Sequence, residues 1–81
     1  MTVRVQFFSW FKDITGCATL TETLPEGSTL EELFQHLVRR FPKFASLERS
    51  VLMAVGVEYQ DRAYTLNNGD EVSLFPPVQG G

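Results

Sequence analysis

Side chains that could catalyse a reaction or bind a metal are few in this 81-residue chain, which has one histidine and one cysteine. A zinc or iron–sulfur site needs several such ligands, so neither residue can form one alone. The histidine, His36, falls on the polar side of an apolar helical stripe, and we predict a solvated surface side chain rather than a ligand or a base. The cysteine, Cys17, follows Gly16 at the entrance of a predicted strand. This position favours a small half-buried side chain over a nucleophile.

Clusters of charged residues have simpler explanations than catalysis. Glu31 and Glu32 stand at capping positions of a predicted helix, whereas Asp70 and Glu71 stand in and after a predicted turn. Residues 39–43 (RRFPK) form a basic cluster, which we attribute to the negative end of the helix dipole rather than to binding of a polyanion. We therefore predict no metal site and no acid–base pair.

The Gly-Gly end of the sequence is the feature that folding does not explain. Such a pair adds nothing to a core, but residues without side chains can thread a narrow channel in another protein. The preceding diproline stiffens the base of the tail and lowers the entropy lost on docking. Six extended residues reach roughly 20 Å. We predict that the tail threads a channel of a partner and brings Gly81 into the partner's active site. The threading residues are Pro76, Pro77, Val78, Gln79 and Gly80.

Composition argues against several classes of partner. Ten Asp and Glu outnumber seven Lys and Arg, for a net charge of −3, which argues against nucleic acid and anionic membranes. No apolar run approaches the roughly 20 residues of a membrane span, and the alternating first residues do not form a signal peptide. The length suits one small domain without a deep cofactor pocket. We expect a cytoplasmic protein.

The hydrophobic pattern predicts one main helix on one sheet. Helical spacing of apolar residues predicts a helix over about Leu30–Arg40, with two capping boxes that start at Ser28 and Thr29. Alternation or apolar runs predict strands over 3–7, 18–24, 51–57 and 71–75. They also predict a short helix or turn at 10–14, a short hairpin or edge segment at 58–64 and a turn at 67–70. The run 51–57 is apolar almost throughout, so we expect that strand to be buried on both faces or central. The order predicts an α+β two-layer domain.

Motifs at both ends of the chain carry a family resemblance. They are Phe7–Ser9, Lys12-Asp13 and Gly16 near the start, then Gly69–Val72, Phe75–Val78 and Gly80-Gly81. With these motifs the whole chain resembles the small sulfur-carrier subunits of molybdopterin synthases, which have the ubiquitin-like β-grasp fold. The resemblance implies a mixed sheet of four or five strands under one main helix. It also implies a β-grasp domain over residues 1–75 and a flexible tail over 76–81.

The resemblance implies a role in molybdenum cofactor (molybdopterin) biosynthesis. A ubiquitin-activating-like adenylyltransferase would use ATP to adenylate the Gly81 carboxylate, and sulfur transfer would then give a thiocarboxylate. The tail would donate this sulfur to a pterin precursor in the large synthase subunit, within a hetero-oligomer. This chain would bind no cofactor and would be a non-catalytic, sulfur-donating subunit of the complex.

A docking surface is expected beside the tail. If Val3, Val5 and Phe7 face the helix, then Phe8 faces away, and the alternation Glu71-Val72-Ser73-Leu74-Phe75 turns Phe75 outward as well. The first and last strands are neighbours in a β-grasp sheet. We therefore expect Phe8 and Phe75 to lie close together and to bind a partner.

Other functions are compatible with the same residues. A sulfur carrier for another pathway, such as the thiamine type, or a ubiquitin-like protein modifier would use the same tail. A non-catalytic β-grasp interaction module would make no use of Gly80 and Gly81.

Overall fold

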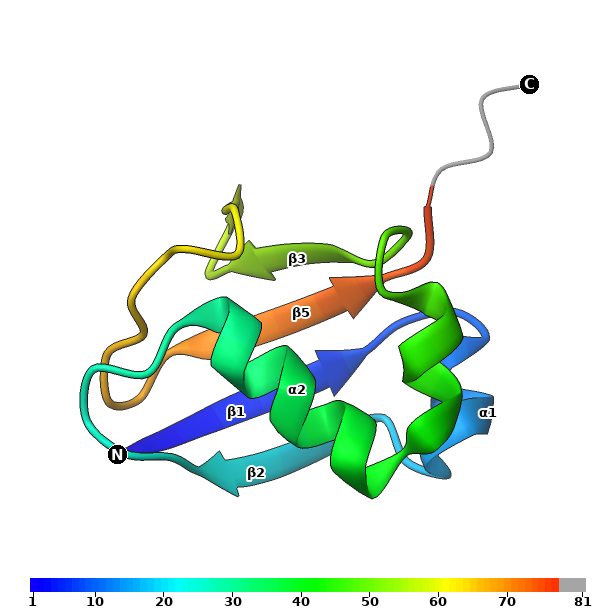
Figure 1. Cartoon of the computed structure of the whole chain (residues 1–81), viewed down its shortest axis with the longest axis horizontal. Coiled ribbons are helices and arrows are strands. Elements are labelled where there is room, and N and C mark those ends of the chain that lie inside the picture. Colours follow the sequence, from blue (N-terminus) through cyan, green and yellow to red (C-terminus); the bar gives the residue numbers. More distant parts are fainter. Residues whose placement is uncertain (78–81) are drawn as a thin grey trace.

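A computed structural model of the chain describes residues 1–77, which fold into one sheet with a helix across it (Figure 1). In chain order the elements are β1 (Thr2–Phe7), α1 (Phe11–Thr15), β2 (Thr19–Thr23), α2 (Leu30–Arg40), the 3₁₀ helix η1 (Pro42–Leu47), β3 (Leu52–Val55), β4 (Glu58–Tyr59) and β5 (Glu71–Phe75). None of the helices in residues 1–77 has the length and apolar character of a transmembrane span.

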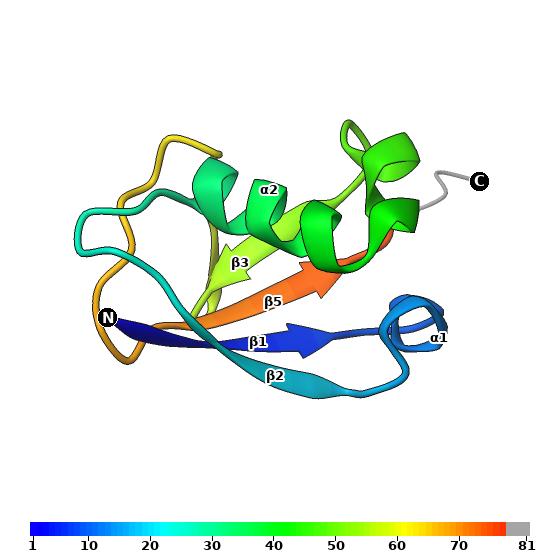
Figure 2. The ribbon, with the colours of Figure 1, turned by 60° about the horizontal axis from the view of Figure 1, so that its bottom comes forward.

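The five strands form a mixed sheet in the order β2-β1-β5-β3-β4. The first and last strands, β1 and β5, are parallel neighbours, whereas the other neighbouring pairs are antiparallel. Helix α2 lies across one face, and Figure 2 shows that no described element covers the opposite face, which we call the open face. The predicted α+β class, with a mixed sheet under one main helix, is confirmed.

Helix α2 begins and ends where the sequence predicted. The backbone N–H of Glu32 donates to Thr29 Oγ1 at 3.2 Å, and the Thr29 N–H donates to Glu32 Oε1 at 3.1 Å, so this capping box starts the helix. The other predicted box, at Ser28, does not form. The Ser28 hydroxyl donates instead to the Pro25 carbonyl at 2.7 Å. The buried face of α2 presents Leu30, Leu33, Phe34 and Leu37 to the sheet.

A cluster of phenylalanine rings fills the core beneath the end of α2. Phe44 is fully buried, and its ring centroid lies 5.3–6.3 Å from those of Phe7, Phe11, Phe34 and Phe41. Phe44 belongs to η1, which the sequence analysis did not predict. A six-residue 3₁₀ helix with proline at its start is too short to show a period of its own.

The predicted strand over 51–57 is shorter and more exposed than expected. Strand β3 ends at Val55 because Gly56, with a φ of 62°, turns the chain into the edge strand β4. Leu52 is 37% exposed and Val57 is 97% exposed, and the central strand of the sheet is β5. The prediction of burial on both faces holds for Met53 and Ala54, which are 3% and 7% exposed, but not for Leu52 or Val57, and the prediction of a central position is wrong. The apolar residues here partly belong to the open face.

His36 is not the solvated histidine that the sequence predicted. Glu22 of β2 is only 2% exposed, and its two carboxylate oxygens contact His36 Nε2 and the Arg40 guanidinium, both on α2. Helical spacing placed His36 on the polar side of the apolar stripe, but this part of α2 faces the edge strand β2, where Glu22 provides a polar partner. The three side chains form a polar clamp between β2 and α2.

Substitutions at the two ends of the polar clamp should lower the free energy of unfolding by unequal amounts. Arg40→Met should lower the free energy of unfolding by about 1–3 kcal/mol, because it leaves a buried carboxylate with fewer partners. Glu22→Met should cost less, since the Arg40 and His36 side chains are 48% and 32% exposed and can return to water. Urea unfolding of both variants measures the difference. An equal or larger loss in Glu22→Met would contradict this account of the clamp.

Candidate functional site

The predicted tail begins where β5 ends, at one end of the sheet. Pro76 is half-buried and Pro77 is exposed, and both follow Phe75 outside any helix or strand. Figure 1 shows that the chain leaves the sheet at the end where α1 lies. The remaining predicted tail residues, Val78, Gln79, Gly80 and Gly81, lie outside the described residues.

Two aromatic rings lie together beside this exit. The centroids of Phe8 and Phe75 are 4.6 Å apart, with 14° between the ring planes, which is a stacked pair. The pair follows from the parallel register, which sets Phe7 opposite Leu74 and lets the Phe8 N–H donate to the Leu74 carbonyl at 3.1 Å. Alternation along β1 and β5, together with the strand order that the family resemblance implied, therefore predicted the juxtaposition correctly, whereas the binding role of the two rings stays a prediction.

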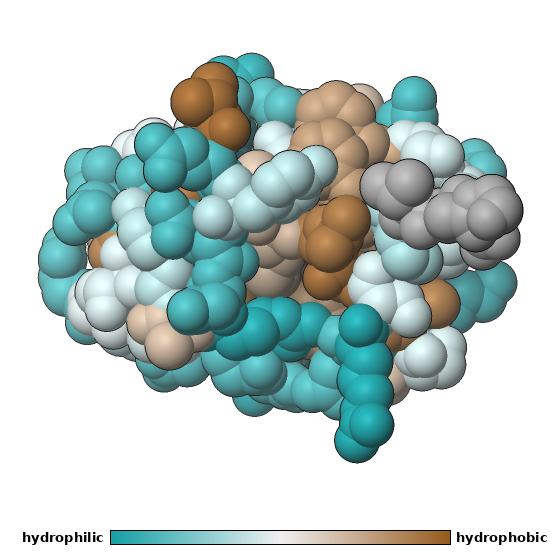
Figure 3. Space-filling view, turned by 90° about the horizontal axis from the view of Figure 1, so that it is seen from above, coloured by the Kyte–Doolittle hydropathy of each residue, from teal (hydrophilic) through white to brown (hydrophobic). Residues whose placement is uncertain are grey.

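The apolar surface around this pair is wider than the sequence analysis expected. The Tyr59 ring lies 6.1 Å from that of Phe75 at an angle of 65°, and Leu52 stands opposite Phe75 in the register of β3 with β5. Phe8, Leu52 and Tyr59 are 38%, 37% and 65% exposed. We call Phe8, Leu52, Tyr59 and Phe75 the open-face patch. Viewed over the β4 edge, the molecule shows apolar surface gathered across its middle (Figure 3).

Tyr59 and Leu52 were missed for a local reason. The turn at Gly56 folds β4 back on β3, which sets Tyr59 opposite Ala54 and therefore on the same face as Ser73 and Phe75. The sequence predicted a short hairpin or edge segment over 58–64, but not its pairing or register with β3. Ser73 lies on this face as predicted, yet it is only 7% exposed, so it forms part of the floor between the larger side chains.

The polar residues considered for catalysis have structural partners. Cys17 is half-buried, as predicted, and its backbone N–H donates to Thr15 Oγ1. Asp70 accepts the Asn67 N–H within the predicted turn, and Glu31 pairs with Arg62 at 3.1 Å. Across residues 1–77 no three His, Cys, Asp or Glu side chains gather as metal ligands would. The arrangement therefore favours a protein-binding surface beside an exiting chain.

Comparison with known proteins gives a consistent result. The model of the ThiS family matches residues 5–81. The molybdopterin synthase sulfur carrier subunit of Escherichia coli is 35% identical over 81 residues, which cover 98% of this chain and 99% of the relative.

Solved structures agree with the sequence relatives. A protein of Pyrococcus furiosus, assigned as molybdopterin converting factor subunit 1, superimposes with a TM-score of 0.89 at 29% identity, covering 96% of this chain and 99% of that one. A chain in the complex of subunits 1 and 2 of molybdopterin-converting factor from Helicobacter pylori superimposes with a TM-score of 0.70 at 26% identity, and both chains are fully covered.

The stacked rings predict a measurable energetic coupling. In a double-mutant cycle of Phe8→Leu and Phe75→Leu, urea unfolding should give a coupling free energy of about 0.5–1.5 kcal/mol, because each single change removes the same ring contact. The cycle of Phe8→Leu with Tyr59→Leu serves as the control, since the contacts within residues 1–77 include no ring pair between Phe8 and Tyr59. Equal coupling in both cycles would refute a specific stack.

Proposed function

The chain belongs to the ThiS family, and on that premise we propose that it carries sulfur for the synthesis of molybdopterin. The Escherichia coli relative that it matches nearly end to end is itself a molybdopterin synthase sulfur carrier subunit. The open-face patch supports the proposal most directly, because it lies at the point where the chain leaves β5 towards Gly80-Gly81. A partner that covers the patch is therefore in position to receive the tail.

The chemistry of the proposal takes place at Gly81. A carboxylate is a poor electrophile, because its negative charge reduces the reactivity of the carbonyl carbon and oxide is a poor leaving group. A Gly81 oxygen therefore attacks the α-phosphorus of ATP, and pyrophosphate leaves. The outer sulfur of a donor persulfide then attacks the carbonyl carbon and AMP leaves, which gives an acyl disulfide. A thiol attacks the donor sulfur of that disulfide, so that the Gly81 thiocarboxylate is released and a disulfide remains on the donor side. Glycine suits both steps, since no Cβ shields the carbonyl.

Two partners follow from this chemistry. The adenylation step requires an adenylyltransferase that holds ATP, because we assign no nucleotide site to this chain. The sulfur-donating step requires a large synthase subunit, in which the thiocarboxylate donates its sulfur to a pterin precursor and hydrolysis of the acyl–sulfur bond returns the Gly81 carboxylate. The complex of subunits 1 and 2 from Helicobacter pylori supports the second partner. We place both steps in the cytoplasm, where ATP is available.

The fold contributes position rather than catalysis in this proposal. The Phe8–Phe75 stack fixes the base of the tail against β1, and Pro76-Pro77 limits the conformations of the next residues. A tail with a fixed base loses less entropy when it enters a channel. The domain therefore acts as a handle that the two partners bind in turn.

Intact mass of the protein purified from its native host tests the proposal. We expect a fraction of the molecules to show the mass change of one sulfur-for-oxygen exchange, located by fragmentation at Gly81. Deletion of Gly81 should abolish molybdopterin synthesis and leave the thermal unfolding midpoint unchanged. Conjugates on lysines of other proteins would instead indicate a protein modifier, and neither product would indicate an interaction module.

The open-face patch predicts a separate effect on assembly. Phe75→Glu should weaken binding to the large subunit at least about tenfold, because it puts a charge in the centre of an apolar contact. Thr21→Glu is the matched control, since Thr21 is exposed on the same face in β2 but lies outside the patch. Isothermal titration calorimetry measures both affinities, and circular dichroism checks the fold. Equal affinities for the two variants would remove the patch from the interface.

A further inference from the structure

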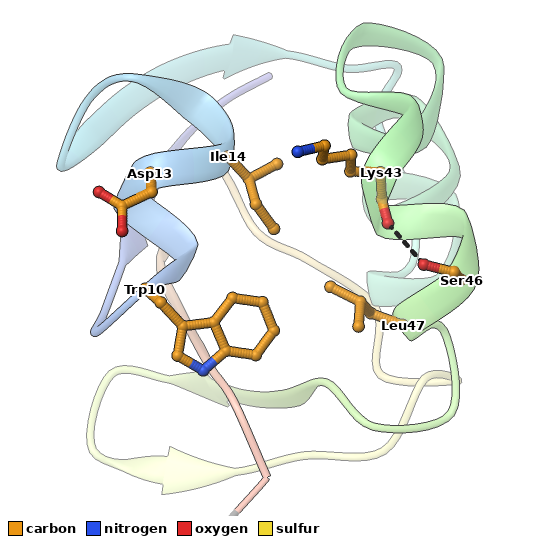
Figure 4. Close-up of a pocket in the computed structure, with 6 residues that line it drawn as sticks. All are labelled: Trp10, Asp13, Ile14, Lys43, Ser46 and Leu47. Atoms are coloured by element: carbon orange, nitrogen blue, oxygen red, sulfur yellow. Dashed lines mark hydrogen bonds between the residues drawn. The ribbon is translucent and has the colours of Figure 1, made fainter.

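A groove outside the open-face patch separates α1 from η1. It has a volume of about 440 Å³ and is lined by Trp10, Asp13, Ile14, Lys43, Ser46 and Leu47. Figure 4 shows the Trp10 ring, Ile14 and Leu47 facing one another across the gap. Trp10 is 45% exposed, although a large aromatic side chain of this kind gains free energy from burial. We call this feature the α1–η1 groove.

The walls of the α1–η1 groove rest on the core. The Trp10 ring packs edge-on against Phe11 with centroids 4.7 Å apart, and Phe11 packs in turn against Phe44 of η1 at 5.3 Å. Phe11 and Phe44 are fully buried. The two walls are therefore joined by packed rings beneath the groove, and an incoming side chain would find it already formed.

One charged side chain of the groove lining, Lys43, is available to a partner. Lys43 forms no ion pair within residues 1–77, and Figure 4 shows its amine extending from η1 towards Ile14, whereas the Asp13 carboxylate points away from η1. Lys12 of α1 and Arg39 in the last turn of α2 are also exposed cations at this end of the molecule.

The groove adjoins the surface proposed to bind the large subunit. Trp10 follows Phe8 by two residues, and a tight turn joins them, in which the Phe11 N–H donates to the Phe8 carbonyl at 3.2 Å. Phe8 is part of the open-face patch, so one side of this turn belongs to the patch and the other to the groove. A single partner can therefore cover both.

We propose that the α1–η1 groove is a second docking site for the large synthase subunit, and that it takes an apolar side chain flanked by carboxylates. The apolar side chain fills the space between Trp10, Ile14 and Leu47. A carboxylate beside it pairs with Lys43, which the fold leaves without a partner among the described residues. This inference rests on the proposed function for the identity of the partner, and it adds the chemistry of the segment that binds.

Charge reversal in the groove tests the inference with purified large subunit. Lys43→Glu should weaken binding about tenfold at low ionic strength, and less in high salt, because it replaces an attraction with a repulsion. Arg49→Glu is the matched control, since it makes the same change in charge at an exposed residue outside the groove. Trp10→Ala should weaken binding by a similar factor without the salt dependence.

A direct reading comes from the one tryptophan of the chain. With 5-fluorotryptophan incorporated at Trp10, unlabelled large subunit should shift the ¹⁹F resonance of the wild-type protein. Equal binding by Lys43→Glu and Arg49→Glu, together with an unshifted resonance, would overturn the role of the groove as a docking site. The proposed function would still be supported in that case by wild-type binding and the Gly81 thiocarboxylate. If Lys43→Glu weakened binding to the adenylyltransferase but not to the large subunit, the choice of partner would be overturned. Absence of wild-type binding to the large subunit would overturn both proposals.

Discussion

The parallel pairing of β1 with β5 is the constraint on which the proposed binding surface depends. A parallel pair brings the C-terminal ends of both strands to the same edge of the sheet. The register of Phe7 with Leu74 then sets Phe8 beside Phe75, next to the exit of the chain. Because side chains alternate between faces, a slip of one residue in β5 would turn Phe75 towards α2 and remove it from the open face.

Much of this arrangement could be predicted from the sequence, because it depends on periodicity. Alternation in β1 and β5 and the apolar stripe of α2 identified the strands, the helix and the face that each side chain takes. The Phe8–Phe75 contact also needed the family resemblance, which implied that the first and last strands are neighbours. Features that depend on tertiary contacts were missed. Phe44 could not be recognised as a core residue, because η1 has no period of its own, and Tyr59 could not be placed without the register of β3 with β4.

Charge was the other property that the sequence described incompletely. The net charge of −3 is a sum over the chain, whereas a partner meets only one end of the molecule. The fold uses Arg40 to neutralise the buried Glu22 and leaves Lys43 exposed at the α1–η1 groove. Among the three cations of a cluster first attributed to the helix dipole, Arg40 is thus structural, whereas Lys43 has no ion pair within residues 1–77, and only the contacts separate the two.

The place of β5 in the sheet also affects how the protein is made. The central strand is the last strand to be synthesised, so β1 and β3 have no shared neighbour until β5 leaves the ribosome. Pairing of strands so distant along the chain requires closure of a long loop and is intrinsically slow. Until β5 is available, the strand edges of β1 and β3 that pair with it in the finished sheet therefore lack their partner. During that interval, it is the incomplete sheet that chaperones would recognise.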